Sequence, residues 1–128
     1  DGREGWKSEK YNMDKINIPF QVTDWKKIPA TEHIGETGTA YWRTLQLGNL
    51  RVRVVEYSAN YLADHWCEKG HILYCLEGEL ISEMKDGSEY ILKAGMSYQV
   101  SDDLSSHRSR TEKGAKLFIV DGDFLKLK

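Results

Sequence analysis

The sequence lacks the features of several protein classes. It has only two cysteines in 128 residues, too few for a disulfide scaffold, which favours free thiols in a reducing, cytoplasmic compartment. Its longest apolar run, Ile72 to Leu76, is far too short to cross a bilayer. Acidic and basic residues are interleaved, with a net charge of −2 and no basic stripe. We therefore expect neither a nucleic acid nor a membrane as a partner.

The length allows one domain core and is too short for two. Residues 1–12, DGREGWKSEKYN, are polar and show no hydrophobic period, so we predict an N-terminal extension, disordered or non-native, before a natural start at Met13. Residues 13–128 form the single predicted domain. The arm from Ile16 to Val22 is broken by Pro19 and can form an edge strand at most, of a kind that pairs with a neighbouring subunit.

Residues 23–38 are predicted to hold a capped helical turn and then a loop, and from Thr39 onward the chain reads as short strands. Three pairs of strands flank turn residues and are predicted hairpins: Ala40 to Leu47 with Leu50 to Tyr57, Glu79 to Met84 with Ser88 to Leu92, and His107 to Thr111 with Lys116 to Val120. Strands about ten residues apart, with almost no helical period, indicate an all-β sandwich or barrel. A double-sheet jelly roll is one of the few solutions at this length.

The stretch from residue 59 to residue 78 concentrates candidate metal ligands. If a strand runs through His65 and Cys67, both side chains point to one face, and a following strand brings His71 beside them. His107, far along the chain, completes the set. Imidazole nitrogen and thiolate sulfur suit borderline and soft divalent metals. We predict a metal site formed by these four residues; the alternative is hydrogen-bonded histidines and a small buried cysteine.

The spacing of these residues resembles that of the cupins. The first cupin motif has the form G-x5-H-x-H-x3,4-E-x6-G, and this chain reads Ala59-x5-His65-x-Cys67-x3-His71-x6-Gly78. The segment ADHWCEK also resembles a small group of cupins with an Asp-His-Trp-Cys (DHWC) signature and no assigned activity.

A second cupin motif, roughly G-x5,7-P-x-G-x2-H-x3-N, is matched in spacing from Gly95 through His107 to Thr111. The resemblance covers most of residues 38–121. It implies an all-β, cupin-type double-stranded β-helix, that is, a single-domain jelly-roll barrel, with a divalent metal between its sheets.

Two departures from the cupin pattern bear on the metal. A typical cupin site has three histidines and one glutamate on octahedral iron, manganese or nickel, whereas Cys67 here replaces the second histidine and His71 replaces the glutamate. A His3Cys set is softer and favours tetrahedral Zn²⁺ as the cofactor, and four bound side chains would leave no open position. The alternatives are Fe, Mn or Ni, with iron held by three histidines and Cys67 as a neighbouring thiol.

Side chains beside the metal would line a substrate pocket at one end of the barrel, for which the candidates are Arg43, Arg51, Arg53, Tyr57 and Tyr98. Arg51 and Arg53 share one face of a strand. If that face looks inward, they offer bidentate partners to a carboxylate or phosphate. The alternation with valines by itself favours solvent-facing arginines. Arg108, next to His107, is expected to face outward.

Two functions remain open at this stage. One is a small metal-binding cupin protein without assigned activity, whose metal is structural or whose barrel binds a small-molecule ligand. The other is a metal-dependent enzyme, of dioxygenase or isomerase type, acting on a small polar metabolite. An open coordination position beside a polar cavity would favour the enzyme, although the sequence shows no obvious general base on the ligand face of the motif, since Glu68 would point to the opposite face. The N-terminal arm and Trp66 predict a homodimer.

Overall fold

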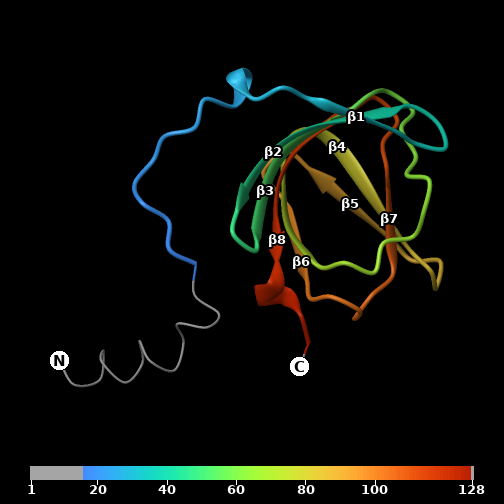
Figure 1. Cartoon of the computed structure of the whole chain (residues 1–128). Helices are drawn as coiled ribbons and strands as arrows, with labels where there is room; N and C mark the ends of the chain where they lie inside the picture. Colours follow the sequence, from blue (N-terminus) through green and yellow to red (C-terminus); the bar gives the residue numbers. More distant parts are fainter. Residues whose placement is uncertain (1–15, 128) are drawn as a thin grey trace.

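The computed structural model describes residues 16–127, which contain eight β-strands and two 3-10 turns. The predicted extension over residues 1–12 lies outside the described residues. The strands are β1 (Thr31–Ile34), β2 (Thr39–Leu47), β3 (Leu50–Tyr57), β4 (His71–Met84), β5 (Glu89–Lys93), β6 (Ser97–Val100), β7 (His107–Arg110) and β8 (Ala115–Gly122), and the turns are η1 (Trp25–Lys27) and η2 (Asp123–Leu125). Figure 1 shows the strands wrapped into a barrel. No helix in the described part is long and apolar enough to cross a membrane.

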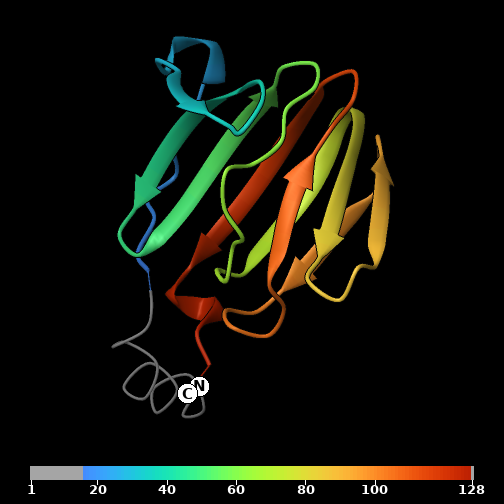
Figure 2. The ribbon, with the colours of Figure 1, turned by 90° about the vertical axis from the view of Figure 1, so that its right-hand side faces the viewer.

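The long strand β4 belongs to two sheets. Its first half pairs with β6 and β8, in a sheet ordered β1-β2-β3-β8-β4-β6, and its second half pairs with β5 and β7. The change occurs at a bulge between Cys75 and Glu77, followed by Gly78 at φ 78°. A Cβ on Gly78 would collide with the carbonyl oxygen of Gly114, so only glycine fits at this corner. Figure 2 shows the two layers that result.

Apolar side chains fill part of the space between the layers. Along the first half of β4, burial alternates: Leu73 and Cys75 are buried on the inward face, and Ile72 and Tyr74 are exposed. Leu73 packs in one cluster with residues of β2, β3, β5 and β8, including the fully buried Leu117. Burying a side chain of this size contributes about 1.5–3 kcal/mol, so this cluster gives the neighbouring polar residues a rigid support.

Two of the three predicted hairpins are confirmed, β2 with β3 and β4 with β5. The third prediction is wrong. β7 pairs with β4, whereas β8 pairs with β3 and β4 in the other sheet. Turn residues show where a chain reverses, and in a jelly roll the next strand often crosses to the opposite layer.

The turn η1, which precedes β1, packs against the outer face of the larger sheet. The predicted edge strand over Ile16 to Val22 is not formed, but the predicted turn is, because the Asp24 side chain caps η1. The ring of Trp25 then packs edge-on against Phe118 of β8, with centroids 6.2 Å apart. The region predicted as a loop contains β1, which pairs with β2.

Candidate metal centre

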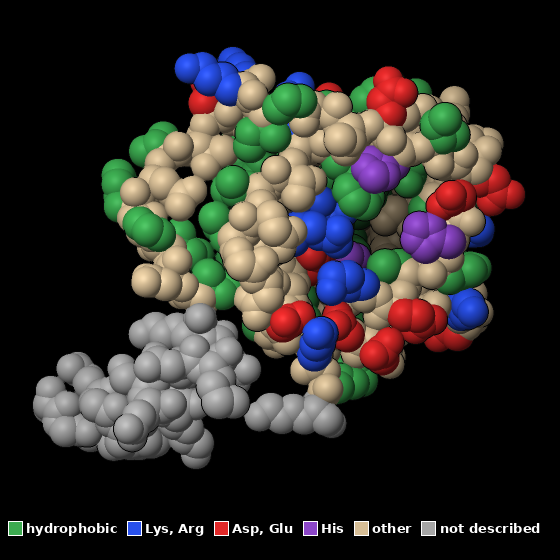
Figure 3. All heavy atoms as spheres, in the orientation of Figure 1, with side chains coloured by type: hydrophobic (Ala, Val, Ile, Leu, Met, Phe, Trp, Pro, Cys, Tyr) green, Lys and Arg blue, Asp and Glu red, His purple; other side chains and the backbone are tan. Residues whose placement is uncertain are grey.

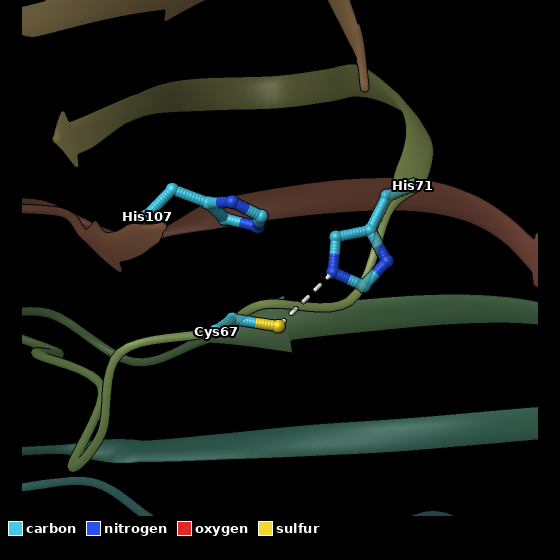
Figure 4. A group of neighbouring side chains, drawn as sticks. All are labelled: Cys67, His71 and His107. Carbon is cyan, nitrogen blue, oxygen red and sulfur yellow. Dashed lines mark hydrogen bonds between the residues drawn. The ribbon is translucent and has the colours of Figure 1, made fainter. Parts of the chain in front are cut away.

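Three of the four predicted ligands lie together between the sheets. Atoms of Cys67, His71 and His107 that can bind a metal all lie within 4.8 Å of one another. Figure 4 shows the three side chains pointing toward a common centre from different segments. Cys67 lies in the loop before β4, His71 opens β4 in one sheet, and His107 opens β7 in the other. The cluster therefore bridges the two layers of the barrel.

Hydrogen bonds at Nδ1 orient both histidines. His71 Nδ1 donates to Asp121 Oδ2 at 2.8 Å, and His107 Nδ1 donates to the carbonyl of Ser105 at 2.9 Å. Because both Nδ1 atoms carry the proton, both Nε2 lone pairs are available for a ligand. His71 Nε2 lies 3.6 Å from Cys67 Sγ. His107 Nε2 is buried without a hydrogen-bond partner among residues 16–127, an arrangement that costs free energy unless a ligand is present.

The thiol of Cys67 is the more acidic of the two cysteine thiols. Burial raises its pKa, but the hydrogen bond with His71, the positive charge that this ring carries when it is protonated, and the charge of Arg53 together lower the pKa below its ordinary value. Burial raises the pKa of Cys75, which lies in the core. Since the thiolate is the form that binds metals, Cys67 has the properties of a ligand and Cys75 those of a packing residue.

The loop that carries Cys67 does not form the strand that would place His65 beside it. A single β-bridge holds the loop here, with Cys67 N donating to His107 O at 2.7 Å and His107 N donating to Cys67 O at 3.1 Å. The His65 side chain is 73% exposed, and its Nδ1 lies 2.6 Å from Asp64 Oδ1. His65 thus lies at the edge of the site, outside the group of three.

A cavity of about 290 Å³ opens beside the three residues. Four of the five predicted pocket residues line it, namely Arg51, Arg53, Tyr57 and Tyr98, and so do Trp42, Tyr61, His65, Lys69 and Arg108. Arg43 does not, because its guanidinium donates to the carbonyls of Trp25 and Ile28 beside η1. Arg108, expected to face outward, forms part of the wall.

A buried carboxylate, Asp121, connects the arginines to His71 of the candidate metal site. Arg51 binds it with two hydrogen bonds, of 2.8 and 3.0 Å, and Arg53 with one of 2.9 Å. Burial raises the pKa of Asp121, but hydrogen bonds from His71 and Arg51 and the charges of the arginines outweigh it and hold the pKa well below its usual range. Sequence reasoning missed this residue. Its signal is an acid directly after the apolar run FIV in a central strand.

Two tyrosines add neutral donors to the wall. Burial raises the pKa of Tyr57, an effect that Ser109 and Arg53 only partly offset, and burial is also the main cause of the raised pKa of Tyr98. Both phenols therefore stay protonated near neutral pH. The Tyr98 hydroxyl is buried and has no hydrogen-bond partner in the described chain.

A larger cavity, of about 450 Å³, shares Tyr98 and His107 with the first. Its wall is largely neutral and includes the hydroxyls of Ser82 and Ser106, which are buried and lack partners within the described residues. It contains one residue of the candidate metal-binding group, whereas the smaller cavity is lined by all three. We therefore place the chemistry of the site in the smaller cavity.

No protein-family model matches the sequence, and no curated protein matches it. Among solved structures, the chain is similar to ectoine synthase from P. lautus, with 20% identity, a TM-score of 0.66, and coverage of 85% of this chain and 80% of that one. It is similar to a predicted oxalate decarboxylase from Thermotoga maritima, with 15% identity, a TM-score of 0.68, and coverage of 80% and 98%. It is also similar to a cupin-2 domain protein from Shewanella frigidimarina, with 18% identity, a TM-score of 0.53, and coverage of 63% of this chain and 78% of that one. From its two-layered architecture and these neighbours, the chain has the cupin fold.

Proposed function

We propose that this protein binds one divalent metal ion through Cys67, His71 and His107, and that the adjoining cavity admits a small polar molecule on which the site acts. The observation that carries the proposal is the convergence of these donors within 4.8 Å, with His107 Nε2 buried and unpaired in the described chain. If these three side chains only packed against one another in the core, nothing would require two imidazole lone pairs and a thiol of lowered pKa to point toward one centre.

The donor set favours Zn²⁺. Two imidazole nitrogens and one thiolate sulfur are borderline to soft ligands, and zinc accepts this mixture in tetrahedral sites. Fe²⁺ is the second candidate, since imidazole also suits iron. Asp121 supports either ion by fixing the ring of His71, as carboxylates do behind ligand histidines.

The arrangement favours a catalytic site over a closed structural one. A closed tetrahedral shell needs a fourth protein ligand, and His65 is mostly exposed and paired with Asp64. With three ligands, one position faces the cavity. A divalent metal held there would act as a Lewis acid on an oxygen atom of the bound molecule or of water. Tyr57 and Tyr98, both protonated, would donate hydrogen bonds to the same molecule.

Metal analysis of three histidine variants tests the proposal. We would purify untagged protein and measure its metal content by elemental mass spectrometry, together with His107→Ala, His65→Ala and, as the matched control, His33→Ala, whose histidine lies outside the site on β1. We expect about one equivalent of zinc in the wild type, in His65→Ala and in the control, and its loss in His107→Ala. Circular dichroism would establish that every variant is folded.

Two results would contradict the proposal: a wild-type protein without metal after growth and dialysis with zinc, or a folded His107→Ala protein that retains it. Loss of metal in His65→Ala would show that His65 swings inward as a fourth ligand. That result would favour the closed, structural site.

A further inference from the structure

The cavity beside the proposed metal ligands is basic. Its wall contains Arg51, Arg53, Lys69 and Arg108, and the lining within the described chain includes no aspartate or glutamate. Figure 3 shows Lys, Arg and His side chains gathered around the hollow on this face. We infer that the cavity binds a small anion through a carboxylate group held by Arg53. That this anion is the molecule on which the site acts rests on the proposed function.

The charges behind the wall do not balance. Asp121 carries one negative charge and faces two guanidinium groups, those of Arg51 and Arg53. Arg51 bonds to both carboxylate oxygens, and Arg53 shares one of them. Arg53 is only 4% exposed, and its Nε has no hydrogen-bond partner among the residues described. A buried positive charge in excess is unfavourable, and an anionic ligand would neutralise it.

The other two basic residues, Arg108 and Lys69, differ in how far nearby carboxylates neutralise their charge. Arg108 forms an ion pair with Glu83 at 2.9 Å, and Glu83 also binds Arg110 at 2.8 Å. Lys69 is partly exposed and has no carboxylate within ion-pair distance in residues 16–127. The cavity therefore has an excess of positive charge at its base, from the pair on Asp121, and at its edge, from Lys69.

The geometry of Arg53 suits a carboxylate. Its guanidinium carbon lies 4.3 Å from the centre of the Trp42 ring, and that of Arg51 lies 5.6 Å from it. Stacked on the ring and tied to Asp121, the Arg53 fork is fixed before a ligand arrives, which lowers the entropic cost of a planar contact with a carboxylate. The volume of about 290 Å³ limits the ligand to a compact molecule, since pockets for drug-sized ligands have volumes of roughly 300–1,000 Å³.

Calorimetric titration of metal-free protein tests the inference separately from the proposed function. Protein stripped with a chelator would be titrated with malonate, with the uncharged isostere malonamide, and with inorganic phosphate. We expect malonate to bind, malonamide to show no heat above dilution, and phosphate to bind more weakly than malonate. If the wild type carries no metal on isolation but still binds malonate when stripped, the proposed function fails and this inference stands.

Three variants locate the contact. We expect Arg53→Gln to weaken malonate binding about 10- to 100-fold, because a charge-assisted hydrogen bond is lost. Since Arg53 is buried and its variant can misfold, Lys69→Gln provides a second measurement at a partly exposed position, with an expected loss of a few fold. Arg43→Gln is the matched control and should bind malonate like the wild type, because Arg43 lies outside the cavity.

Four results would overturn the inference. The first is no binding of malonate to stripped wild-type protein, and the second is equal binding of malonamide. The third is unchanged affinity in Lys69→Gln and in folded Arg53→Gln. Tighter binding of phosphate than of malonate would overturn the assignment of a carboxylate ligand.

Discussion

Replacing Asp121 with asparagine tests how far the site depends on one buried carboxylate. Asp121 is 0% exposed and accepts hydrogen bonds from Arg51, Arg53 and His71. Asparagine has the same shape but no charge, and its amide NH2 would meet groups that can only donate. Removing one partner of a buried ion pair costs about 3–5 kcal/mol, because a charge is left without compensation. We expect Asp121→Asn to lower the free energy of unfolding of the metal-free protein by that amount.

The same change should weaken metal binding, because asparagine holds the His71 ring less firmly and makes it less basic. Losing such a partner of a ligand histidine typically costs 10- to 100-fold in metal affinity. Urea unfolding of stripped protein gives the stability, and competition with a zinc chelator gives the affinity. Asp86→Asn is the matched control, since Asp86 is exposed in the β4–β5 turn and its loss should change stability by no more than about 0.5 kcal/mol.

The two measurements can refute the reasoning separately. An unfolding free energy within 1 kcal/mol of the wild type would show that the arginines tolerate the loss of Asp121, for example by turning to solvent. A large loss of stability with unchanged zinc affinity would show that Asp121 holds the arginines but does not support His71.

Three further predictions concern stability. The folded-state pKa of Asp121 lies below its unfolded value of about 3.9, so the stability that this carboxylate contributes is complete above that pH and is lost as pH falls toward the lower pKa. Below pH 4, the loss of stability with falling pH, followed by circular dichroism, should therefore be less steep in Asp121→Asn than in the wild type. Ser82→Ala removes a buried hydroxyl that lacks a partner in the described chain and should raise the free energy of unfolding in urea by about 1 kcal/mol, whereas a comparable fall would indicate a buried water. Gly87→Ala should cost about 1–2 kcal/mol from its positive φ alone, and Gly78→Ala clearly more, because its Cβ also meets backbone; equal melting temperatures would contradict this.

The fold could be predicted because local patterns determine most of it. The turn residues after β2 and β4 depend on near neighbours in the sequence, and the two hairpins predicted from them are confirmed. The failed hairpin depends on which layer a strand joins, and that is set by packing across the barrel. Similarly, the Pro19 arm is irregular chain with Phe20 and Val22 almost fully exposed, an outcome that strand periodicity does not predict.

The arginine side of the site was harder to predict. In β3, Arg53 and Val54 point to opposite faces and are both buried, because this central strand has the barrel interior on one face and the chain near η1 on the other. The usual rule that arginines alternating with valines face solvent therefore fails. The inward arginines are stable because Asp121 neutralises part of their charge, and the hydrogen-bond partners of Asp121 lie some 50 to 70 residues away in sequence. A local sequence pattern cannot predict a contact between residues so far apart in sequence.

Because Asp121 touches both parts of the site, metal binding and anion binding should be coupled. A metal on His71 Nε2 would make Nδ1–H more acidic and strengthen its hydrogen bond to Asp121, which draws the carboxylate away from Arg53. Arg53 would then have more charge available for an anion. Zinc should therefore tighten malonate binding, and malonate should tighten zinc binding by the same factor, since coupling free energies are reciprocal.

A direct contact between malonate and the metal would also produce such coupling, so the Asp121→Asn protein distinguishes the two routes. If the coupling runs through Asp121, the factor measured by calorimetry with and without zinc should fall toward one in the variant, even where both ligands still bind. If the factor is the same in the variant and the wild type, the anion contacts the metal itself and Asp121 has only a structural role.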